Sequence, residues 1–415
     1  MTDAHGYSEI KCNGYQMLYN PPVYNYIGSK LNLLSFIQQT IEEYTGKPLK
    51  QIESIADLFC GTGAVTYMFI ANQIKRVVAN DLQYYAYILT SSLSKNNIDI
   101  AKLKKSITAI NKEAKDLKLD PTTTDFVTCN FTEHGPDKRK YFTIENGIRI
   151  DYARKKIESM KANLTREEYN FLIKCLLHGV IRVSNITCVY GAFLKSFKDA
   201  AKNTLTLPSD LDKFVLDCPV KLECFNNDIF DLLNGKLDTS QLEVVYLDPP
   251  YSKRRYDTSY HALETIALYD SPTLRGITGL RPEPAVTHFS HKTNSLNDFD
   301  KMFSMIKSKY IFLSYSSDGN VSKEDMIMLL SKYFSNVQCY ETFYKRAKTN
   351  ISKNEQPPNV KEYIFAASAK IPGASEIGKK RELITCTKTQ IFHSMANICD
   401  EVGKIASLLS SALRQ

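Results

Sequence analysis

The amino-acid sequence predicts an α/β protein with a doubly wound, mostly parallel sheet of seven strands and a mainly helical domain inserted into it. Two observations carry this prediction. Short apolar runs rich in β-branched residues alternate with helical patterns, which is typical of a parallel sheet covered by helices on both faces. One connection between two of these runs exceeds a hundred residues, which is far longer than a loop, so it predicts a domain of its own.

Five of the apolar runs are predicted to be buried parallel strands because each one ends in turn residues. They cover residues 52–59, 76–79, 221–225, 242–247 and 310–314. Two later runs, 337–345 and 360–368, are joined by a polar loop that contains proline. We expect these last two strands to form a hairpin at the edge of the sheet.

The long connection divides the chain into domains. We expect residues 95–220 to form the inserted domain, with helices at 100–117 and 169–183, between two parts of a catalytic domain at 20–94 and 221–370. Near the end of the chain, apolar residues recur every three or four positions between 391 and 409. This spacing predicts a helix within a C-terminal extension at 380–415.

The charge of the chain is uneven. It carries 53 Lys and Arg against 45 Asp and Glu, a net charge of +8. Residues 130–205 hold fourteen basic and eight acidic side chains, so six of the eight net positive charges fall in the inserted domain. This concentration favours a surface that faces a polyanion such as DNA, while a solvated helical face is the alternative.

No stretch of eighteen apolar residues occurs, and the first residues lack the basic-then-apolar pattern of a signal peptide. We therefore expect a cytoplasmic protein of the nucleoid region that does not contact a membrane. His288 and His291 form an HxxH pair without a third ligand at metal spacing, so a loop or DNA-facing role is favoured and no metal is expected.

A nucleotide-like cofactor site is predicted where three strands end. The first strand runs into Gly61-Thr-Gly63, where glycine allows the backbone to approach a ligand closely. The second ends at Asp81, which can accept hydrogen bonds from two ribose hydroxyls, and the third ends at Asp228, which can accept one from an adenine amine. Helix capping is the alternative role for both carboxylates. NAD is disfavoured because a third glycine for its pyrophosphate is missing.

The fourth strand ends in Asp248-Pro-Pro-Tyr251. Two prolines cannot continue a central strand, so this tetrapeptide is predicted to lie at the carboxyl edge of the sheet, beside the cofactor site.

Together these segments resemble the bacterial DNA adenine-N6 methyltransferases of the Dam-related restriction-modification type. The resemblance extends from Asn25 to about Ser368. It rests on Asn25-Tyr-Ile-Gly-Ser-Lys30, Asp57-Leu-Phe-Cys-Gly-Thr-Gly63, Asn80-Asp81, Asp228 and Asp248-Pro-Pro-Tyr251. Two later stretches, Tyr260-His-Ala-Leu-Glu-Thr-Ile-Ala-Leu-Tyr-Asp270 and Gly276-Ile-Thr-Gly-Leu-Arg281, are similar to one subgroup of these enzymes.

The resemblance implies a methyltransferase sheet that binds S-adenosyl-L-methionine. It also implies that Tyr26 and Lys30 close the cofactor site and that Asp57 contacts the methionine end. The residues expected to bind the cofactor are Tyr26, Lys30, Asp57, Phe59, Gly61, Gly63, Asp81, Asp228 and Ile229.

The catalytic residues are expected to be Asp248, Pro249, Pro250 and Tyr251. The Asp248 carboxylate and the Pro249 carbonyl would accept the two N–H bonds of an adenine amine, and Tyr251 would stack on an adenine rotated out of double-stranded DNA. This implies a site-specific, adenine-specific DNA methyltransferase, with a restriction endonuclease of the same specificity as an expected partner.

The resemblance also implies that the inserted domain recognises the DNA sequence. Its expected contacts are Arg182, Ser184, Asn185, Tyr190 and Lys195. Lys253, Arg254 and Arg255 follow the catalytic tetrapeptide and are expected to clamp phosphates. A buried helix end and ordinary surface charge are the respective alternatives.

Two other functions stay open at this point. N4-cytosine methyltransferases share the fold and mechanism, although they more often carry Ser at the position of Asp248. A non-catalytic DNA-binding regulator could use the same fold, but the intact Gly61, Gly63, Asp81 and Asp248 disfavour it. Cys218 precedes Pro219, which is the opposite of the order in C5-cytosine enzymes.

Overall fold

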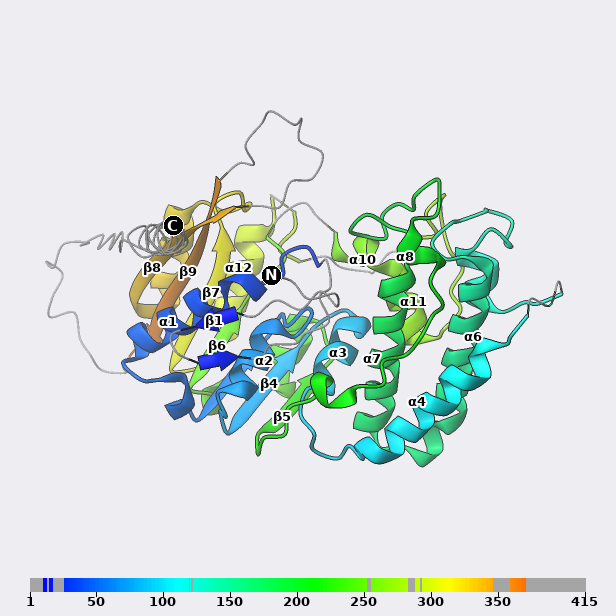
Figure 1. Ribbon diagram of the computed structural model, residues 1–415. Helices are drawn as coiled ribbons and strands as arrows, with labels where there is room; N and C mark the ends of the chain where they lie inside the picture. Colours follow the sequence, from blue (N-terminus) through cyan, green and yellow to red (C-terminus); the bar gives the residue numbers. More distant parts are fainter. Residues whose placement is uncertain are drawn as a thin grey trace, which may run out of the picture.

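The computed structural model describes residues 10–12, 15–17, 26–118, 120, 122–251, 255–282, 288–291, 293–345 and 359–370. Its seven-stranded sheet has the order β5-β4-β3-β6-β7-β9-β8. In Figure 1 the sheet and its flanking helices lie on the left, and a group of helices that includes α4, α6, α7 and α11 lies on the right. The predicted C-terminal extension at 380–415 lies outside the described residues.

Each of the seven predicted strands is present, with ends that shift by up to three residues. The strands are β3 (Ser54–Asp57), β4 (Arg76–Asn80), β5 (Lys221–Phe225), β6 (Val244–Leu247), β7 (Tyr310–Ser316), β8 (Phe334–Lys345) and β9 (Asn359–Ala369). The pairs β5-β4, β4-β3, β3-β6 and β6-β7 are parallel. The prediction of a doubly wound, mostly parallel sheet is therefore confirmed.

The two late strands do form the predicted antiparallel hairpin. β9 also pairs antiparallel with β7, so the hairpin joins the sheet through its second strand and β8 is the edge strand. The ladder between β8 and β9 shifts register between Ser335 and Gln338.

Both faces of the sheet are buried because successive residues of a strand point to opposite sides. Ile55 packs in one apolar cluster with α1 (Leu34–Thr45) and α2 (Ala64–Ala71). Its neighbour Ala56 packs in a second cluster with α9 (Ile229–Asp231), α12 (Ser295–Met305) and α13 (Lys323–Tyr333). Each fully buried large apolar side chain contributes about 1.5–3 kcal/mol to folding.

The insertion between β4 and β5 is helical, as predicted. Its helices are α4 (Ile100–Lys115), α5 (Phe126–Phe131), α6 (Ile144–Met160), α7 (Arg166–Val183) and α8 (Asp199–Lys202). The central helix is α7, which begins with a capping box between Thr165 and Glu168 and has 13 buried residues. This nearly continuous burial follows from its position between the sheet unit and the other inserted helices (Figure 1).

Two helices from outside the insertion share its apolar core. α3 (Tyr84–Ser91) follows β4, and α11 (His261–Leu268) follows the catalytic tetrapeptide after the short α10 (Tyr256–Ser259). Leu89 of α3 and Leu263 of α11 lie in one cluster with Leu176 of α7. The predicted insertion thus packs as one body with segments that the sequence assigns to the catalytic domain.

Shorter elements complete the described chain. They are β1 (Ile10–Cys12) and β2 (Tyr15–Met17), which pair antiparallel, and the single turns of helix η1 (Leu31–Leu33), η2 (Leu49–Gln51), η3 (Lys161–Asn163), η4 (Leu211–Phe214), η5 (Leu232–Lys236) and η6 (Thr239–Gln241). No helix in the described part of the chain combines the length and apolar character needed to cross a membrane.

Arg154 joins α6 to α11 and should be a main determinant of stability. Its buried guanidinium donates to the carbonyl oxygens of Ile266 (3.0 Å) and Ala267 (3.3 Å) and pairs with Glu158 (2.9 Å). We expect Arg154→Met to lower the free energy of unfolding by about 2–4 kcal/mol, because the two carbonyls lose their donor inside the protein. Thermal denaturation measures this loss.

The matched control is Lys155→Met at the neighbouring exposed position, which should change stability by less than about 0.5 kcal/mol. Equal stabilities of the two variants would contradict the role of Arg154.

Candidate active site

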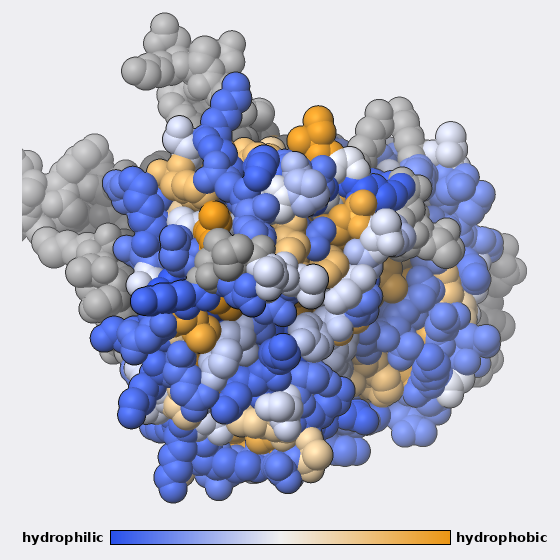
Figure 2. Space-filling model, turned by 90° about the vertical axis from the view of Figure 1, so that its right-hand side faces the viewer, coloured by the Kyte–Doolittle hydropathy of each residue, from blue (hydrophilic) through white to orange (hydrophobic). Residues whose placement is uncertain are grey.

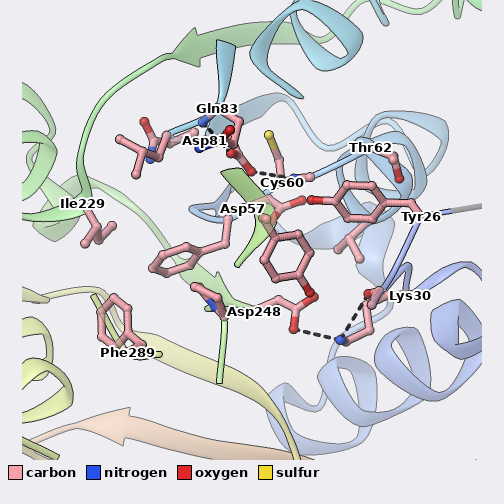
Figure 3. Close-up of a pocket in the computed structure, with 18 of the residues that line it drawn as sticks. Tyr26, Lys30, Asp57, Cys60, Thr62, Asp81, Gln83, Ile229, Asp248 and Phe289 are labelled. Atoms are coloured by element: carbon pink, nitrogen blue, oxygen red, sulfur yellow. Dashed lines mark hydrogen bonds and ion pairs between the residues drawn. The ribbon is translucent and has the colours of Figure 1, made fainter. Parts of the chain in front are cut away.

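A deep cavity opens at the carboxyl edge of the sheet, where β3, β4, β5 and β6 end (Figure 3). Its empty volume is about 1150 Å³, which includes the solvent space at its mouth. The chain reverses its winding direction here, since β4 and β5 lie on one side of β3 and β6 lies on the other. Ligands of doubly wound folds bind at this point.

The structure gathers most of the predicted cofactor residues around this cavity. All of the nine except Gly63 line it: Tyr26, Lys30, Asp57, Phe59, Gly61, Asp81, Asp228 and Ile229. Asp248, Pro250 and Arg255 from the other predicted sets line it as well.

The turn after β3 depends on glycine. Gly61 has φ +51° and Gly63 has φ +79°, backbone conformations that other residues rarely adopt. A Cβ atom on Gly61 would also lie 3.2 Å from the ring of Tyr26. The turn therefore keeps the backbone close to the cavity and to the Tyr26 side chain above it.

Asp57 ends β3 with a carboxylate that is almost fully buried. Thr66 of α2 donates a hydrogen bond to its Oδ2 (2.7 Å), whereas Oδ1 is buried without a partner. Burial raises the pKa of Asp57 to about 7, and the hydrogen bond from Thr66 opposes this rise. A buried carboxylate oxygen without a partner calls for a donor or cation from a ligand.

Asp81 follows β4 and is held by backbone donors. Its Oδ2 accepts from the N–H of Gly61 (2.8 Å) and its Oδ1 from the N–H of Gln83 (2.9 Å). Burial raises the pKa of Asp81 to about 6, against the effect of these hydrogen bonds. Each oxygen keeps a second lone pair, so the fixed carboxylate can still accept hydrogen bonds from a ribose.

Asp228 follows β5 and does cap a helix, as the alternative interpretation held. Its Oδ1 accepts from the N–H of Phe230 (2.8 Å), and its Oδ2 lies 3.2 Å from Nε2 of His288. His288 packs edge-on against the Phe230 ring, with 4.5 Å between the centroids, and Phe289 beside it lines the cavity together with Ile229 (Figure 3). Capping leaves the Asp228 carboxylate at the rim of the cavity.

His288 and Phe289 were not predicted from the sequence to be cavity residues. The HxxH pattern drew attention to His288, but its partner Asp228 lies 60 positions earlier in the chain, and no motif connects the two. Among the residues that the structure describes, no group of three or more His, Cys, Asp or Glu side chains is placed to hold a metal ion.

Asp248, at the end of β6, forms an ion pair with Lys30. The distance from Lys30 Nζ to Asp248 Oδ1 is 2.8 Å, and the two side chains are 5% and 16% exposed (Figure 3). Burial lowers the pKa of Lys30, but Asp248 together with Tyr251, Tyr246 and Glu362 more than offsets this, so the net pKa lies well above the usual value. Burial raises the pKa of Asp248, and Lys30 opposes the rise. Lys30 therefore keeps a positive charge beside the Asp248 carboxylate.

Tyr251 lies next to this pair. The Lys30 ammonium is 5.5 Å from the centre of its ring, and the ring packs against Tyr315 with 5.1 Å between centroids. Its carbonyl accepts a hydrogen bond from the N–H of Asn320 (3.0 Å). The ring of Tyr251 is thus supported by Tyr315 of β7.

A cluster of tyrosines joins the cavity to the helical unit. Tyr26 stacks on Tyr260 with 4.8 Å between centroids, and the Tyr260 hydroxyl accepts from the N–H of Ile27 (2.8 Å). One helical turn further along α11, the Glu264 carboxylate accepts from the N–H groups of Tyr84 and Tyr85, each at 2.9 Å. α11 therefore supports both Tyr26 and the start of α3, directly after Asp81.

The five residues predicted to contact DNA in the insertion fall into two groups. Arg182 and Lys195 are exposed. Ser184, Asn185 and Tyr190 are buried, and their side chains are bonded inside the protein: Ser184 to the Val180 carbonyl, Asn185 to the carbonyls of Lys140 and Leu194, and Tyr190 to Ser184. In this conformation these three side chains shape the loop and do not reach its surface.

Of the three basic residues after the tetrapeptide, Arg255 is described. Its guanidinium pairs with Asp257 through Nη2 (2.7 Å) at the rim of the cavity. Lys253 and Arg254 lie outside the described residues.

A model of the family described as D12 class N6 adenine-specific DNA methyltransferase matches residues 26–329. The chain belongs to this family. The match confirms the resemblance seen in the motifs, and it selects N6-adenine over the N4-cytosine alternative. The protein is thus an adenine-specific DNA methyltransferase whose cofactor is S-adenosyl-L-methionine and whose substrate is DNA.

Relatives of this methyltransferase align over most of its length. It is 32% identical over 332 residues to the type II methyltransferase M.NlaIII of Neisseria lactamica, and the aligned residues cover 80% of this chain and 94% of the relative. It is 33% identical over 341 residues to M.CviAII of Paramecium bursaria Chlorella virus 1, with 82% and 97% covered. M.FokI of Planomicrobium okeanokoites is 33% identical over 349 residues, covering 82% of this chain but 52% of that larger protein.

The cavity fits this cofactor in its chemistry. The methionine ammonium of S-adenosylmethionine would supply the partner that Asp57 Oδ1 lacks, and the ribose hydroxyls would meet Asp81. Phe59, Ile229 and Phe289 provide apolar surface for the adenine ring.

We expect Asp57→Asn to stabilise the methyltransferase in the absence of cofactor at high pH. The folded protein keeps the Asp57 proton up to a pH of about 7, while the unfolded chain releases it near 3.8. Wild-type stability therefore falls as the pH rises between these values, and the variant escapes this loss. The gain should be near zero below about pH 3, should reach about 4 kcal/mol by pH 8, and can be measured by thermal denaturation.

Asp231→Asn at an exposed position is the control and should show no pH-dependent gain. S-adenosylmethionine should stabilise the wild type more than Asp57→Asn. A gain that is independent of pH would rule out ionisation of Asp57 as its cause.

Proposed function

We propose that this methyltransferase transfers a methyl group to the N6 amine of an adenine rotated out of double-stranded DNA, with Asp248 as the residue that binds the amine. The observation that supports this most directly is the Asp248 carboxylate at the end of β6, which lines the same cavity as Asp57, Asp81 and Asp228. The amine and the methyl donor would thus meet in one pocket.

The chemistry of adenine explains why a carboxylate is needed. The lone pair of the N6 amine is delocalised into the ring, so the amine is a weak nucleophile. Asp248 Oδ2 and the Pro249 carbonyl would accept its two N–H bonds and direct the lone pair toward the methyl group that S-adenosylmethionine supplies. Alignment of this kind lowers the barrier by about 7–11 kcal/mol, and hydrogen bonds placed in advance add roughly 3–4.

Lys30 acquires a role in this proposal beyond closing the cofactor site. Its ammonium occupies Asp248 Oδ1, and no described residue is hydrogen-bonded to Oδ2. The cation holds the carboxylate ionised in a buried place and fixes its orientation. It therefore leaves one oxygen for the substrate amine.

Access of the adenine requires that the base leave the duplex, because its amine cannot reach the cavity from within a base pair. Tyr251 would stack on the extruded base, and its ring is already fixed by Lys30 and Tyr315. Stacking of a base on an aromatic ring contributes about 1–3 kcal/mol.

The helical insertion is proposed as the target-recognition domain, with Arg182 and Lys195 as its DNA contacts and the buried Ser184, Asn185 and Tyr190 as supports of that loop. Figure 2 shows that this end of the molecule has a mainly hydrophilic surface. Since several relatives are named type II methyltransferases, we infer that a restriction endonuclease of the same specificity is its partner, and that both act on the nucleoid in the cytoplasm.

Asp248→Ala should lower the rate of methyl transfer at least about 10³-fold while the affinity for S-adenosylmethionine changes little. Lys30 would become an unpaired buried cation, so the single variant also loses stability. The double variant Lys30→Met/Asp248→Ala removes both charges and should be folded and inactive. Transfer of labelled methyl groups to duplex DNA gives the rate, and near-normal turnover in the double variant would exclude the role of Asp248.

Arg182→Ala/Lys195→Ala should bind duplex DNA more weakly and with a smaller dependence on salt. Each lost phosphate contact lowers the slope of log K against log salt by about one. The matched control, Lys105→Ala/Lys112→Ala, removes the same charge from exposed positions of α4 and should keep the wild-type slope. Fluorescence anisotropy at several salt concentrations measures the DNA affinity and its dependence on salt. If Arg182→Ala/Lys195→Ala has the same slope as the wild type, these two residues do not contact the DNA phosphates.

A further inference from the structure

The most exposed large hydrophobic side chain in the described part of the chain is Ile277, which is 81% exposed. It lies in a tight turn between Arg275 and Leu280, whose backbone N–H and carbonyl groups bond to each other (2.7 and 2.8 Å). The N–H of Gly279 donates to the carbonyl of Gly276 (3.2 Å) and closes the turn. Ile277 and Thr278 are thus its two central residues.

The turn is held rigidly from inside the helical unit. The guanidinium of Arg139, which is 3% exposed, donates to the carbonyls of Ile277 (Nε, 3.0 Å) and Gly276 (Nη2, 3.1 Å). The Tyr141 hydroxyl lies 3.0 Å from the carbonyl of Thr278. Gly279 has φ +72°, and a Cβ there would lie 3.0 Å from the Arg139 guanidinium. These contacts hold the backbone of the turn in a position that leaves the Ile277 side chain exposed.

This arrangement is unfavourable for an ordinary surface turn. Turn positions favour Asn, Asp, Ser, Gly and Pro, whereas Ile and Thr have branched, stiff side chains. Single exposed hydrophobic residues are common on proteins, and Figure 2 shows several in a hydrophilic surround. Chance exposure of Ile277 would not require its turn to be fixed, yet the buried Arg139 donates hydrogen bonds to two carbonyls of the turn. A stiff side chain on a rigid base also loses little entropy when it is inserted into a partner.

The turn lies beside the surfaces that DNA is proposed to use. The Tyr141 hydroxyl that supports Thr278 is also 2.6 Å from the carbonyl of Tyr190, in the loop that carries Lys195. Arg275 at the base of the turn is exposed.

A hollow of about 610 Å³ extends from the turn toward the active site. It is lined by Arg275, Leu280 and Arg281 at the end near the turn. Gln83 and Asp257 line both this hollow and the main cavity. The turn that carries Ile277 therefore lies at one end of this hollow, and the other end of the hollow lies at the rim of the active-site cavity.

We propose that Ile277 is an apolar wedge that enters the duplex beside the target adenine and stabilises the extruded state. Apolar side chains carried by DNA-bending proteins insert between base pairs in this way and separate the stacked bases. The inference rests on the proposed extrusion of the adenine and adds the residue that takes up the vacated space. Ile277 is thus a positioning residue, since it touches neither the amine nor the cofactor.

The test compares Ile277→Ala with wild type on two duplexes that carry the recognition sequence, one with a normal T opposite the target adenine and one with a mispaired base there. Weakening of the pair removes most of the cost of extrusion. We expect Ile277→Ala to methylate the matched duplex roughly 10- to 100-fold more slowly and the mispaired duplex within about threefold of wild type. In the matched duplex, 2-aminopurine at the target should also fluoresce less with the variant.

Three controls make the result decisive. Ile277→Val keeps a stiff apolar side chain and should restore most of the rate, while Met328→Ala removes another exposed hydrophobic residue and should behave as wild type. Unchanged cofactor affinity and melting temperature would show that Ile277→Ala folds normally. If the variant methylates the matched duplex as fast as wild type, or loses the same factor on both duplexes, Ile277 is no wedge. If the wild type itself causes no rise in 2-aminopurine fluorescence, the result contradicts the proposed extrusion of the target adenine.

Discussion

Four carboxylates meet at one edge of the sheet, and their enclosure there is the constraint on which the rest of the site depends. Parallel strands bring Asp57, Asp81, Asp228 and Asp248 together because they share one direction. Lys30 forms an ion pair with Asp248, and His288 contacts Asp228. Asp57 and Asp81, in contrast, accept hydrogen bonds from neutral groups. Burial raises the pKa of Asp57, Asp81 and Asp248, and the hydrogen bonds and the Lys30 charge only partly oppose this rise. The free protein holds part of its acidic edge in an unfavourable state that a cationic, hydroxyl-bearing cofactor would relieve.

Local patterns in the sequence were sufficient to predict this edge. Each strand that feeds it is a short apolar run, and each of the four carboxylates ends its strand or follows it within three residues, although the role of Asp57 was implied only by the family resemblance. The Gly61 turn and the two prolines after Asp248 have few structural alternatives, so their positions could be inferred from chemistry alone. The hairpin at one edge of the sheet was predicted as well and is confirmed.

Contacts between distant segments could not be predicted in this way. The Lys30 and Asp248 pair joins positions more than two hundred residues apart, and His288 reaches Asp228 from a loop without a recognisable motif. Ser184, Asn185 and Tyr190 have the polar side chains of a DNA-reading loop, but burial depends on how α7 packs against neighbours such as Tyr141. Side-chain type indicates what a residue can bond, and only packing determines which partner it meets.

The packing of α11 has a consequence for protein engineering. Residues 95–220 are contiguous in sequence and look like a cassette that could be exchanged between relatives to change specificity. Their apolar core, however, also contains Leu89 of α3 and Leu263 of α11, and Glu264 bonds the backbone just after Asp81. A graft cut at the ends of the insertion would separate the two sides of this interface and disturb the turn that carries Asp81. A chimaera that transplants α3 and residues 256–281 together with the insertion would keep that interface whole.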